Sequence, residues 1–207
     1  LVGFPKLDTG FVRAINCSRH EGNTSKLLLA LNKLPEITDL NSELLDSRFI
    51  FAPSIETVEK GFNPSKYNQI SKNPTFEFTI PSFIDPSLSP SDISLVSVTI
   101  QNTPYNINES WDKYKSSLQN LVIKKIEHFS PGFSKSIIKS KFLSPMDIEN
   151  SYLVPGGHWH HSELQVDRMY SLRPAFGFAD YKSPIEGLYI CGAGTHPGGG
   201  LTGVPGH

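Results

Sequence analysis

The end of the chain constrains its fold most strongly, because a glycine tract there follows a run of apolar residues from Leu188 to Cys191. An apolar run bounded by glycines is typical of a buried strand. Glycines after a strand let the backbone adopt positive φ and approach a ligand closely. We therefore expect a buried strand of a parallel sheet at 188–191 and a turn at 192–194. Eight of the 16 glycines of the chain lie in this closing segment, at positions 187, 192, 194, 198, 199, 200, 203 and 206.

A turn of this kind is one way in which α/β folds hold a nucleotide cofactor. The glycine-rich turn lies at the carboxyl end of a strand, and the free N–H groups of the next helix meet the negative charge of the cofactor. Residues 198–207 would lead into that helix. Glycine tracts at strand ends also form plain loops, and the spacing alone favours that interpretation over a cofactor site. It is not a phosphate-binding loop of the kinase or GTPase type, since no Lys-Ser or Lys-Thr follows "GAG".

Upstream, the pattern predicts several strands. The segments "FEFTI" (76–80) and "SLVSVTIQ" (94–101) alternate apolar with polar residues, as half-buried strands do. The apolar run at 27–31 predicts a further strand, and residues 134–143 another. Three prolines between 81 and 92 indicate a long connection and not a tight hairpin. These features predict an antiparallel or mixed sheet with one packed face.

One long helix is expected at 108–129, where apolar residues recur at i, i+3, i+4 and i+7. Asn108 would cap its start and Pro131-Gly132 would end it. Shorter helices are expected at 54–61, with Ser54 as the cap, and at 145–150. Strands separated by helices and long loops indicate an α/β or α+β fold.

Charge and composition exclude some classes of function. The chain has 19 basic and 20 acidic residues, and its formal charge of −1 would not draw it to nucleic acid or to an anionic membrane. No apolar run is long enough for a transmembrane helix. Cys17 and Cys191 are expected to be reduced thiols, which indicates an intracellular compartment, cytoplasmic or mitochondrial matrix, with peripheral membrane contact left open. Cys191 is expected to fill the core.

The segment from Leu153 to His207 resembles the C-terminal signature of the phytoene-desaturase-like FAD-dependent oxidoreductases, in the branch of pyridine nucleotide-disulfide oxidoreductase domain proteins. Upstream, "TSKLLLALNKLP", "FTIPSFIDPSLSP" and "HFSPGFSKSI" also resemble that branch. The matching pieces near the end are Pro155-Gly156-Gly157, His161, Asp167, Arg173-Pro174, Tyr181, Pro184, Gly187 to Cys191, and Gly192 through Gly206.

The resemblance implies an amine-oxidase-like flavoprotein architecture. Residues 1–152 would form part of an α+β substrate domain with a mixed sheet, and residues 153–207 would return into a Rossmann-like FAD-binding domain. This sequence lacks the G-x-G-x-x-G opening and the acidic ribose-binding residue of such proteins. It is therefore expected to be a C-terminal fragment whose N-terminal half is a necessary partner, and to be inactive alone.

The same resemblance implies FAD as the cofactor. Gly192 and Ala193 would lie against its ribityl and pyrophosphate portion through the backbone, because Ala193 stands where many relatives carry an acidic residue. Amides of residues 201–204 would point at the pyrimidine edge of the flavin and stabilise the negative charge that develops there. The residues expected to bind the cofactor are Gly192, Ala193, Gly194, Thr195, Leu201, Thr202, Gly203 and Val204.

The reaction implied is a dehydrogenation, in which hydride passes from a C–H bond of an apolar or amphipathic substrate to the flavin. The protein would promote the reaction by placing the substrate and excluding water, so no catalytic acid or base is assigned. His161, Glu163 and His196 are candidates for the substrate cavity, although His196 is equally well explained as a loop residue packed on Pro197. The alternative function is a non-catalytic binding or interaction module derived from a flavoprotein, without a cofactor.

The remaining motifs favour structural roles. "HWHH" (158–161) has spacings that can place two imidazoles on one ion, but no Asp-rich or Cys-rich motif accompanies it, so no metal site is predicted. Asp167 and Arg173 are expected to pair as a brace. Five aromatic residues are expected mainly in the core, namely Trp159, Tyr170, Phe176, Phe178 and Tyr181.

Overall fold

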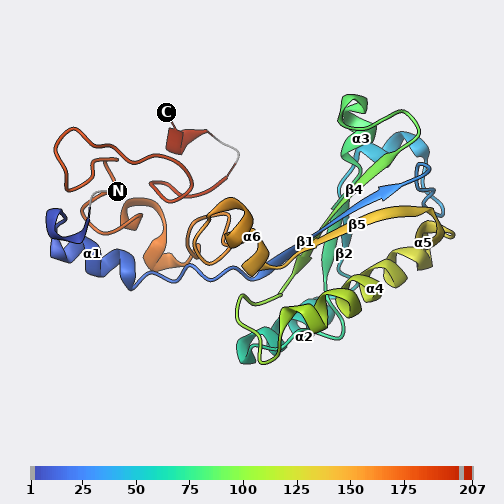
Figure 1. The fold of residues 1–207 in the computed structure, drawn as a ribbon, viewed down its shortest axis with the longest axis horizontal. Coiled ribbons are helices and arrows are strands. Elements are labelled where there is room, and N and C mark those ends of the chain that lie inside the picture. The colour runs from blue at the N-terminus through green and yellow to red at the C-terminus, as the bar shows by residue number, and fades with distance from the viewer. Residues whose placement is uncertain (1–2, 201–202, 207) are drawn as a thin grey trace. The chain divides into compact units, whose positions relative to one another are not determined.

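The computed structural model describes residues 3–200 and 203–206. The chain forms two compact units. Residues Asn23–Asp147 make up the first, which we call the sheet unit. Residues Leu1–Gly22 and Ile148–His207 make up the second, which we call the loop unit because it contains little regular structure. Figure 1 shows the elements of both.

The sheet unit is built on five strands in the order β2-β3-β4-β1-β5. Every neighbouring pair is antiparallel, which confirms the antiparallel alternative of the prediction and not the mixed sheet. A mixed sheet would need at least one pair of parallel strands, and parallel neighbours are joined by a crossover connection. Four of the five strands were predicted, whereas β2 lies in a stretch that was expected to be a surface excursion. The strands are β1 (Thr24–Leu31), β2 (Phe49–Phe51), β3 (Phe76–Thr79), β4 (Ser94–Gln101) and β5 (Ile137–Leu143).

Side-chain alternation gives the sheet one packed face. Leu27, Leu29 and Leu31 are at most 2% exposed, whereas Leu28 between them is 37% exposed. Val96 and Val98 on β4 are buried on the same side as the odd-numbered leucines. Alternate residues of both strands therefore enter the core, although only β4 shows this alternation in its sequence and β1 reads as a continuous apolar run.

Helix α4 (Trp111–Phe129) covers the packed face (Figure 1). Its residues Leu118, Val122 and Ile126 belong to the same buried cluster as the strand leucines. The helix begins later than predicted, because Ser110 is the cap and its Oγ accepts from the amide of Asp112 at 3.3 Å. Asn108 instead donates its side-chain amide to the carbonyl of Tyr67.

Short helices fill the connections. Helix α2 (Ile55–Phe62) confirms the predicted helix and its cap, since Ser54 Oγ accepts from the amide of Thr57 at 3.1 Å. The proline-rich connection holds α3 (Pro81–Ile84) and a 3-10 turn at Pro86–Leu88. Helix α5 (Phe133–Ser136) occupies residues that were expected to begin β5. Further 3-10 turns lie at Ser42–Asp46 and Asn63–Tyr67.

The loop unit contains α1 (Thr9–Asn16) and most of α6 (Pro145–Tyr152), which crosses the boundary between the units. The helix expected at 145–150 is thereby confirmed. The other elements of the loop unit are 3-10 turns at Phe4–Lys6, Val166–Arg168, Tyr170–Leu172 and Val204–Gly206. No helix in the described part of the chain is both long and apolar enough to cross a membrane.

Glycines join the two ends of the loop unit. The amide of Gly22 donates to the carbonyl of Gly156 at 2.7 Å, beside an antiparallel bridge between Glu21 and Gly157. Gly156 has φ of +66°, and a Cβ there would lie 2.0 Å from the carbonyl oxygen of His20. Only glycine fits so close an approach. The Pro155-Gly156-Gly157 motif thus ties the first residues of the unit to its second half.

The buried strand predicted at 188–191 is wrong. Tyr189 makes one antiparallel bridge with Lys182, and Leu188 and Tyr189 are 44% and 65% exposed. Cys191 is exposed, so it does not fill a core. Cys17 and Cys191 are both free, as expected. A strand needs neighbours for its backbone groups, and among the described residues of the loop unit this segment forms a bridge only with Lys182.

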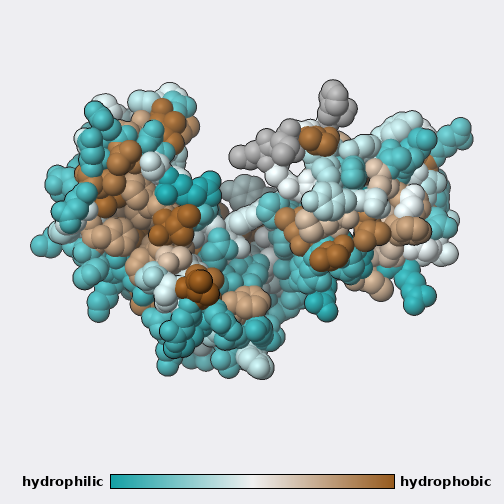
Figure 2. Space-filling view, turned by 180° about the vertical axis from the view of Figure 1, so that it is seen from behind, coloured by the Kyte–Doolittle hydropathy of each residue, from teal (hydrophilic) through white to brown (hydrophobic). Residues whose placement is uncertain are grey.

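The aromatic core predicted for this unit is also not formed. Phe176 is 84% exposed and Tyr170 is 63% exposed, and Trp159 is exposed as well. Phe178 is the exception, since its ring meets that of Phe11 on α1 edge to face at 4.7 Å. Tyr181 is half-buried. Hydrophobic side chains reach the surface in both units (Figure 2).

Candidate functional site

A single buried guanidinium organises the loop unit. Arg173 is 1% exposed, and its Nε donates to the carbonyl of Ala193 at 2.9 Å. Its two terminal nitrogens donate to four carbonyls of the segment 160–168. The planar fork of arginine suits this task, because it presents five donors in fixed directions. The four carbonyls belong to His160, Ser162, Glu163 and Arg168.

The predicted brace between Asp167 and Arg173 is wrong. Asp167 instead lies 3.8 Å from the Nε of Arg168, and its side chain is largely exposed. Burial lowers the pKa of Arg173 from its usual value. The guanidinium of Arg173 remains charged, because an arginine side chain does not lose its proton in proteins. Carbonyl dipoles therefore stabilise this charge where a carboxylate was expected.

Arg173 holds a tight turn formed by Gly192 to Thr195. The amide of Thr195 donates to the carbonyl of Gly192 at 3.0 Å, and the hydroxyl of Thr195 donates to the same oxygen at 2.9 Å. Gly192 has φ of +94°, a conformation that glycine adopts without strain. Among the described residues, the amides of Ala193 and Gly194 have no acceptor. Two donors in a fixed turn are thus available to a ligand.

The end of the chain folds back beside this turn. The amide of Gly192 donates to the carbonyl of Pro205 at 3.1 Å, and a 3-10 turn at Val204–Gly206 follows Gly203. Val204 is 46% exposed. The contact with Pro205 therefore brings the segment 203–206 next to the turn at 192–195. Leu201 and Thr202, which were also expected to bind the cofactor, lie outside the described residues.

The substrate-cavity candidates lie around the same turn. An ideal Cβ on Gly194 would be 3.5 Å from the Cβ of His161, which itself has φ of +63°. The carbonyl of Glu163 accepts from Arg173, and its carboxylate accepts from Gln165. The Nδ1 of His196 is buried and has no partner in the described part of the chain. His161 lies next to the turn and Glu163 is linked to it through Arg173, a role of Arg173 that the sequence pattern did not indicate.

The pKa values of two histidines near Arg173 are lowered. Burial, followed by the charges of His160 and Arg173, lowers the pKa of His158 from 6.5 to about 4. Burial and Arg173 also lower the pKa of His160. The amide of His160 donates to Nδ1 of His158 at 3.2 Å, a contact that requires this nitrogen to be unprotonated. Among the described residues, no three His, Cys, Asp or Glu side chains are grouped to hold a metal ion.

We expect acid to destabilise the loop unit because of His158. Its folded-state pKa of about 4 lies below the unfolded value of 6.5, so the unfolded chain takes up the proton first. The stability that the neutral ring contributes is complete above pH 6.5 and is lost as the pH falls towards 4. Urea unfolding followed by the fluorescence of Trp159 between pH 4 and 7 measures this loss. His158→Gln should flatten the profile, whereas His128→Gln at an exposed site should leave it unchanged.

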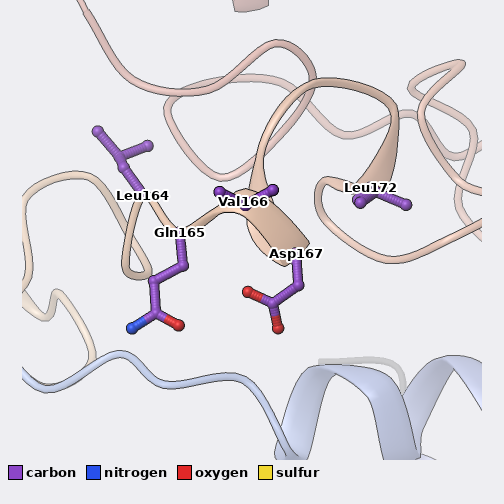
Figure 3. A pocket seen from close by; sticks show the side chains of 5 residues that line it. All are labelled: Leu164, Gln165, Val166, Asp167 and Leu172. Atoms are coloured by element: carbon purple, nitrogen blue, oxygen red, sulfur yellow. The ribbon is translucent and has the colours of Figure 1, made fainter.

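A shallow cavity of about 690 Å³ lies on the same unit. It is lined by the segment Leu164–Asp167 and by Leu172. Figure 3 shows Gln165 and Asp167 pointing to one side of that segment and Leu164 pointing to the other. The backbone beside the cavity is the one that Arg173 binds, so the turn and the cavity depend on the same side chain.

The chain is similar in sequence to several curated oxidoreductases. Pyridine nucleotide-disulfide oxidoreductase domain-containing protein 2 of Rattus norvegicus is 37% identical over 152 residues, which are 72% of this chain and 26% of the relative. Its Mus musculus counterpart is 36% identical over the same shares. The neurosporene-forming phytoene desaturase of Rhodobacter capsulatus is 29% identical over 61% of this chain and 24% of the relative. The chain belongs to the family of phytoene-desaturase-like oxidoreductases.

The matched region is only part of the length of each relative. The chain spans about a quarter of the length of the curated relatives that it matches. No family model matches it. The proteins of this family are oxidoreductases. The chain itself contains an antiparallel sheet and a glycine-rich closing segment.

Proposed function

We propose that this chain forms part of an FAD-dependent dehydrogenase that passes hydride from an apolar or amphipathic substrate to the flavin. The observation that carries the proposal is the turn at 192–195, which is anchored by a buried arginine and holds two amides that have no acceptor among the described residues. The oxidoreductase family supports the same reaction class. Residues 1–152 would belong to the substrate domain, and residues 153–207 would complete the flavin site.

The described residues fit a flavin that is bound through the backbone. An ideal Cβ on Gly192 or on Gly203 meets nothing within 4 Å, so the surface beside both residues is open to a ligand. The amides of Ala193 and Gly194 suit the carbonyl, hydroxyl or phosphate oxygens of such a cofactor. The buried Nδ1 of His196 is a further polar atom, and residues 3–200 and 203–206 supply no partner for it.

Bound FAD would supply the hydride acceptor, and the residues of this chain would act by binding and placement. Amides at 193–194 would fix the cofactor, while Arg173 would keep those amides in position. Backbone donors cost no reorganisation when charge develops, which makes them effective in a site that excludes water. His161 and His196 would lie at the edge of the substrate. The dehydrogenation also releases one proton from the substrate, which would pass to water, so no side chain of the described residues is assigned as acid or base.

We expect Gly192→Ala to reduce retention of FAD by the full-length natural protein. A side chain at φ of +94° costs about 1 to 2 kcal/mol, so the turn should relax and its two amides should leave their positions. The amount of FAD bound per protein molecule, measured from the visible absorption of the purified protein, should fall severalfold. Gly177→Ala is the matched control, because Gly177 has φ of +85° and equally open surroundings but lies outside the glycine tract.

Equal losses of FAD in both glycine variants would contradict the assignment of the turn. A colourless full-length protein that takes up no added FAD would refute the proposed function itself. That result would favour the alternative, a binding module without a cofactor.

A further inference from the structure

The face of the sheet that α4 leaves uncovered carries a compact apolar area. Leu28 and Ala30 project from the centre of it on β1, between β4 and β5. The antiparallel register places Ser97 on one side of Leu28 and Lys141 on the other. It likewise places Leu95 and Lys139 on either side of Ala30. Each of the two cross-strand rows therefore contains a lysine on β5, an apolar residue on β1 and a residue on β4.

These rows form the floor of a hollow of about 300 Å³. Leu28, Ala30 and Leu95 line it, together with Pro81 at the start of α3. Small-molecule sites in proteins begin at about this volume and are mostly apolar in the same way. Towards the other end of β1 the face becomes polar, since Lys26 donates to the hydroxyl of Thr99 at 2.8 Å. The apolar floor is thus limited in length.

Two lysines make one rim of the hollow positively charged. Lys139 and Lys141 are exposed at the rim on β5, and no described carboxylate lies within ion-pair distance of either. The nearest acidic side chain on this face by register, Glu77, lies two strands away from β1 and is paired with Arg48 at 2.7 Å. An anion at the rim would therefore meet two uncompensated positive charges.

We propose that this hollow binds a single-chain amphipathic anion, a medium-chain fatty carboxylate. Its carboxylate would contact Lys139 and Lys141, and its acyl chain would cross β1 and β4 towards Pro81. Two strand spacings amount to about 10 Å, which suits a medium-length chain. Naming this compound class as the substrate rests on the proposed function, whereas binding itself does not.

Charge and shape favour this ligand over the two other occupants of such a face. A second copy of the chain would bring the same lysines, and like charges across an interface repel. A membrane surface is attracted to broad basic areas, whereas this hollow has a short apolar floor with two cations at one rim. The combination of an apolar floor and a cationic rim fits one acyl chain with one carboxylate.

Calorimetric titration of the 207-residue chain with decanoate tests the inference, with 1-decanol as the neutral probe of the same length. We expect K139Q/K141Q to weaken decanoate binding about tenfold, because two exposed ion pairs are lost. Binding of 1-decanol should not change. K33Q/K72Q removes two exposed lysines elsewhere in the sheet unit and should leave both titrations unchanged. Leu28→Asn should weaken both ligands.

Absence of decanoate binding would overturn the inference, and so would equal weakening in the two double variants. Binding to phosphatidylglycerol vesicles without binding of free decanoate would assign the face to a membrane surface. Dimerisation that decanoate does not compete with, but that Leu28→Asn abolishes, would assign it to a second copy. FAD retention is measured separately through Gly192→Ala, so failure of one proposal leaves the other standing.

Discussion

Arg173→Met should destabilise the loop unit by about 3 to 5 kcal/mol, because five carbonyls lose their donor at once. Methionine keeps much of the apolar stem and removes the guanidinium. The turn at 192–195 would lose its anchor at Ala193, and the segment 160–168 would lose four bonds. Hydrogen exchange of the amides in these two segments, together with thermal unfolding, measures the effect.

Arg168→Met is the matched control for that experiment. Arg168 is also partly buried, but its two bonds to the carbonyls of Ala14 and Cys17 are long, at 3.4 Å each. Its loss should cost about 1 kcal/mol or less. Arg173→Lys should recover little, since one ammonium cannot reach carbonyls on both segments. If Arg168→Met were as damaging as Arg173→Met, the central position assigned to Arg173 would be wrong.

Phe76→Ala should destabilise the sheet unit by about 3 to 5 kcal/mol, the usual cost of removing a buried aromatic ring. Phe76 is 1% exposed on β3, and its ring stacks on that of Phe51 with centroids 5.0 Å apart. The variant loses this contact and leaves a cavity in the main cluster. Urea unfolding followed by the fluorescence of the buried Trp111 on α4 gives the free energy of unfolding.

Ile50→Ala tests whether burial sets this cost. Ile50 lies on the neighbouring strand β2 but is 69% exposed, so its truncation should change stability by about 0.5 kcal/mol at most. A loss of stability in Ile50→Ala comparable to that in Phe76→Ala would show that the exposed face carries contacts beyond those described.

Local patterns were sufficient for most of the sheet unit. β3 and β4 are marked in the sequence by alternation, because one face of each strand is buried and the other is not, whereas β1 is marked by a continuous apolar run. The cap of α4 shows the limit of such patterns. Asn108 and Ser110 are both good capping residues, and only the contact of Asn108 with Tyr67 decides between them.

The loop unit was harder to predict because its main partners are backbone atoms. The carbonyls that bind Arg173 belong to residues of unrelated types, so no side-chain pattern marks them. Asp167 looked like the natural partner of Arg173 by charge alone. The apolar residues at 188–191 read as a buried strand, yet in this chain they have one bridge and remain exposed. Glycine positions were the most informative signal there, since Gly156 and Gly192 each require a conformation that other residues avoid.

The order of the strands has a consequence for how the chain folds. β1 is an interior strand between β4 and β5, but these two neighbours begin only at Ser94 and Ile137. During synthesis the leucines of β1 therefore emerge long before either partner strand exists. Pairings so distant in sequence form slowly, and unpaired apolar strands invite association with other chains in the meantime. The nascent chain would depend most on chaperones during the interval between the synthesis of β1 and that of β4.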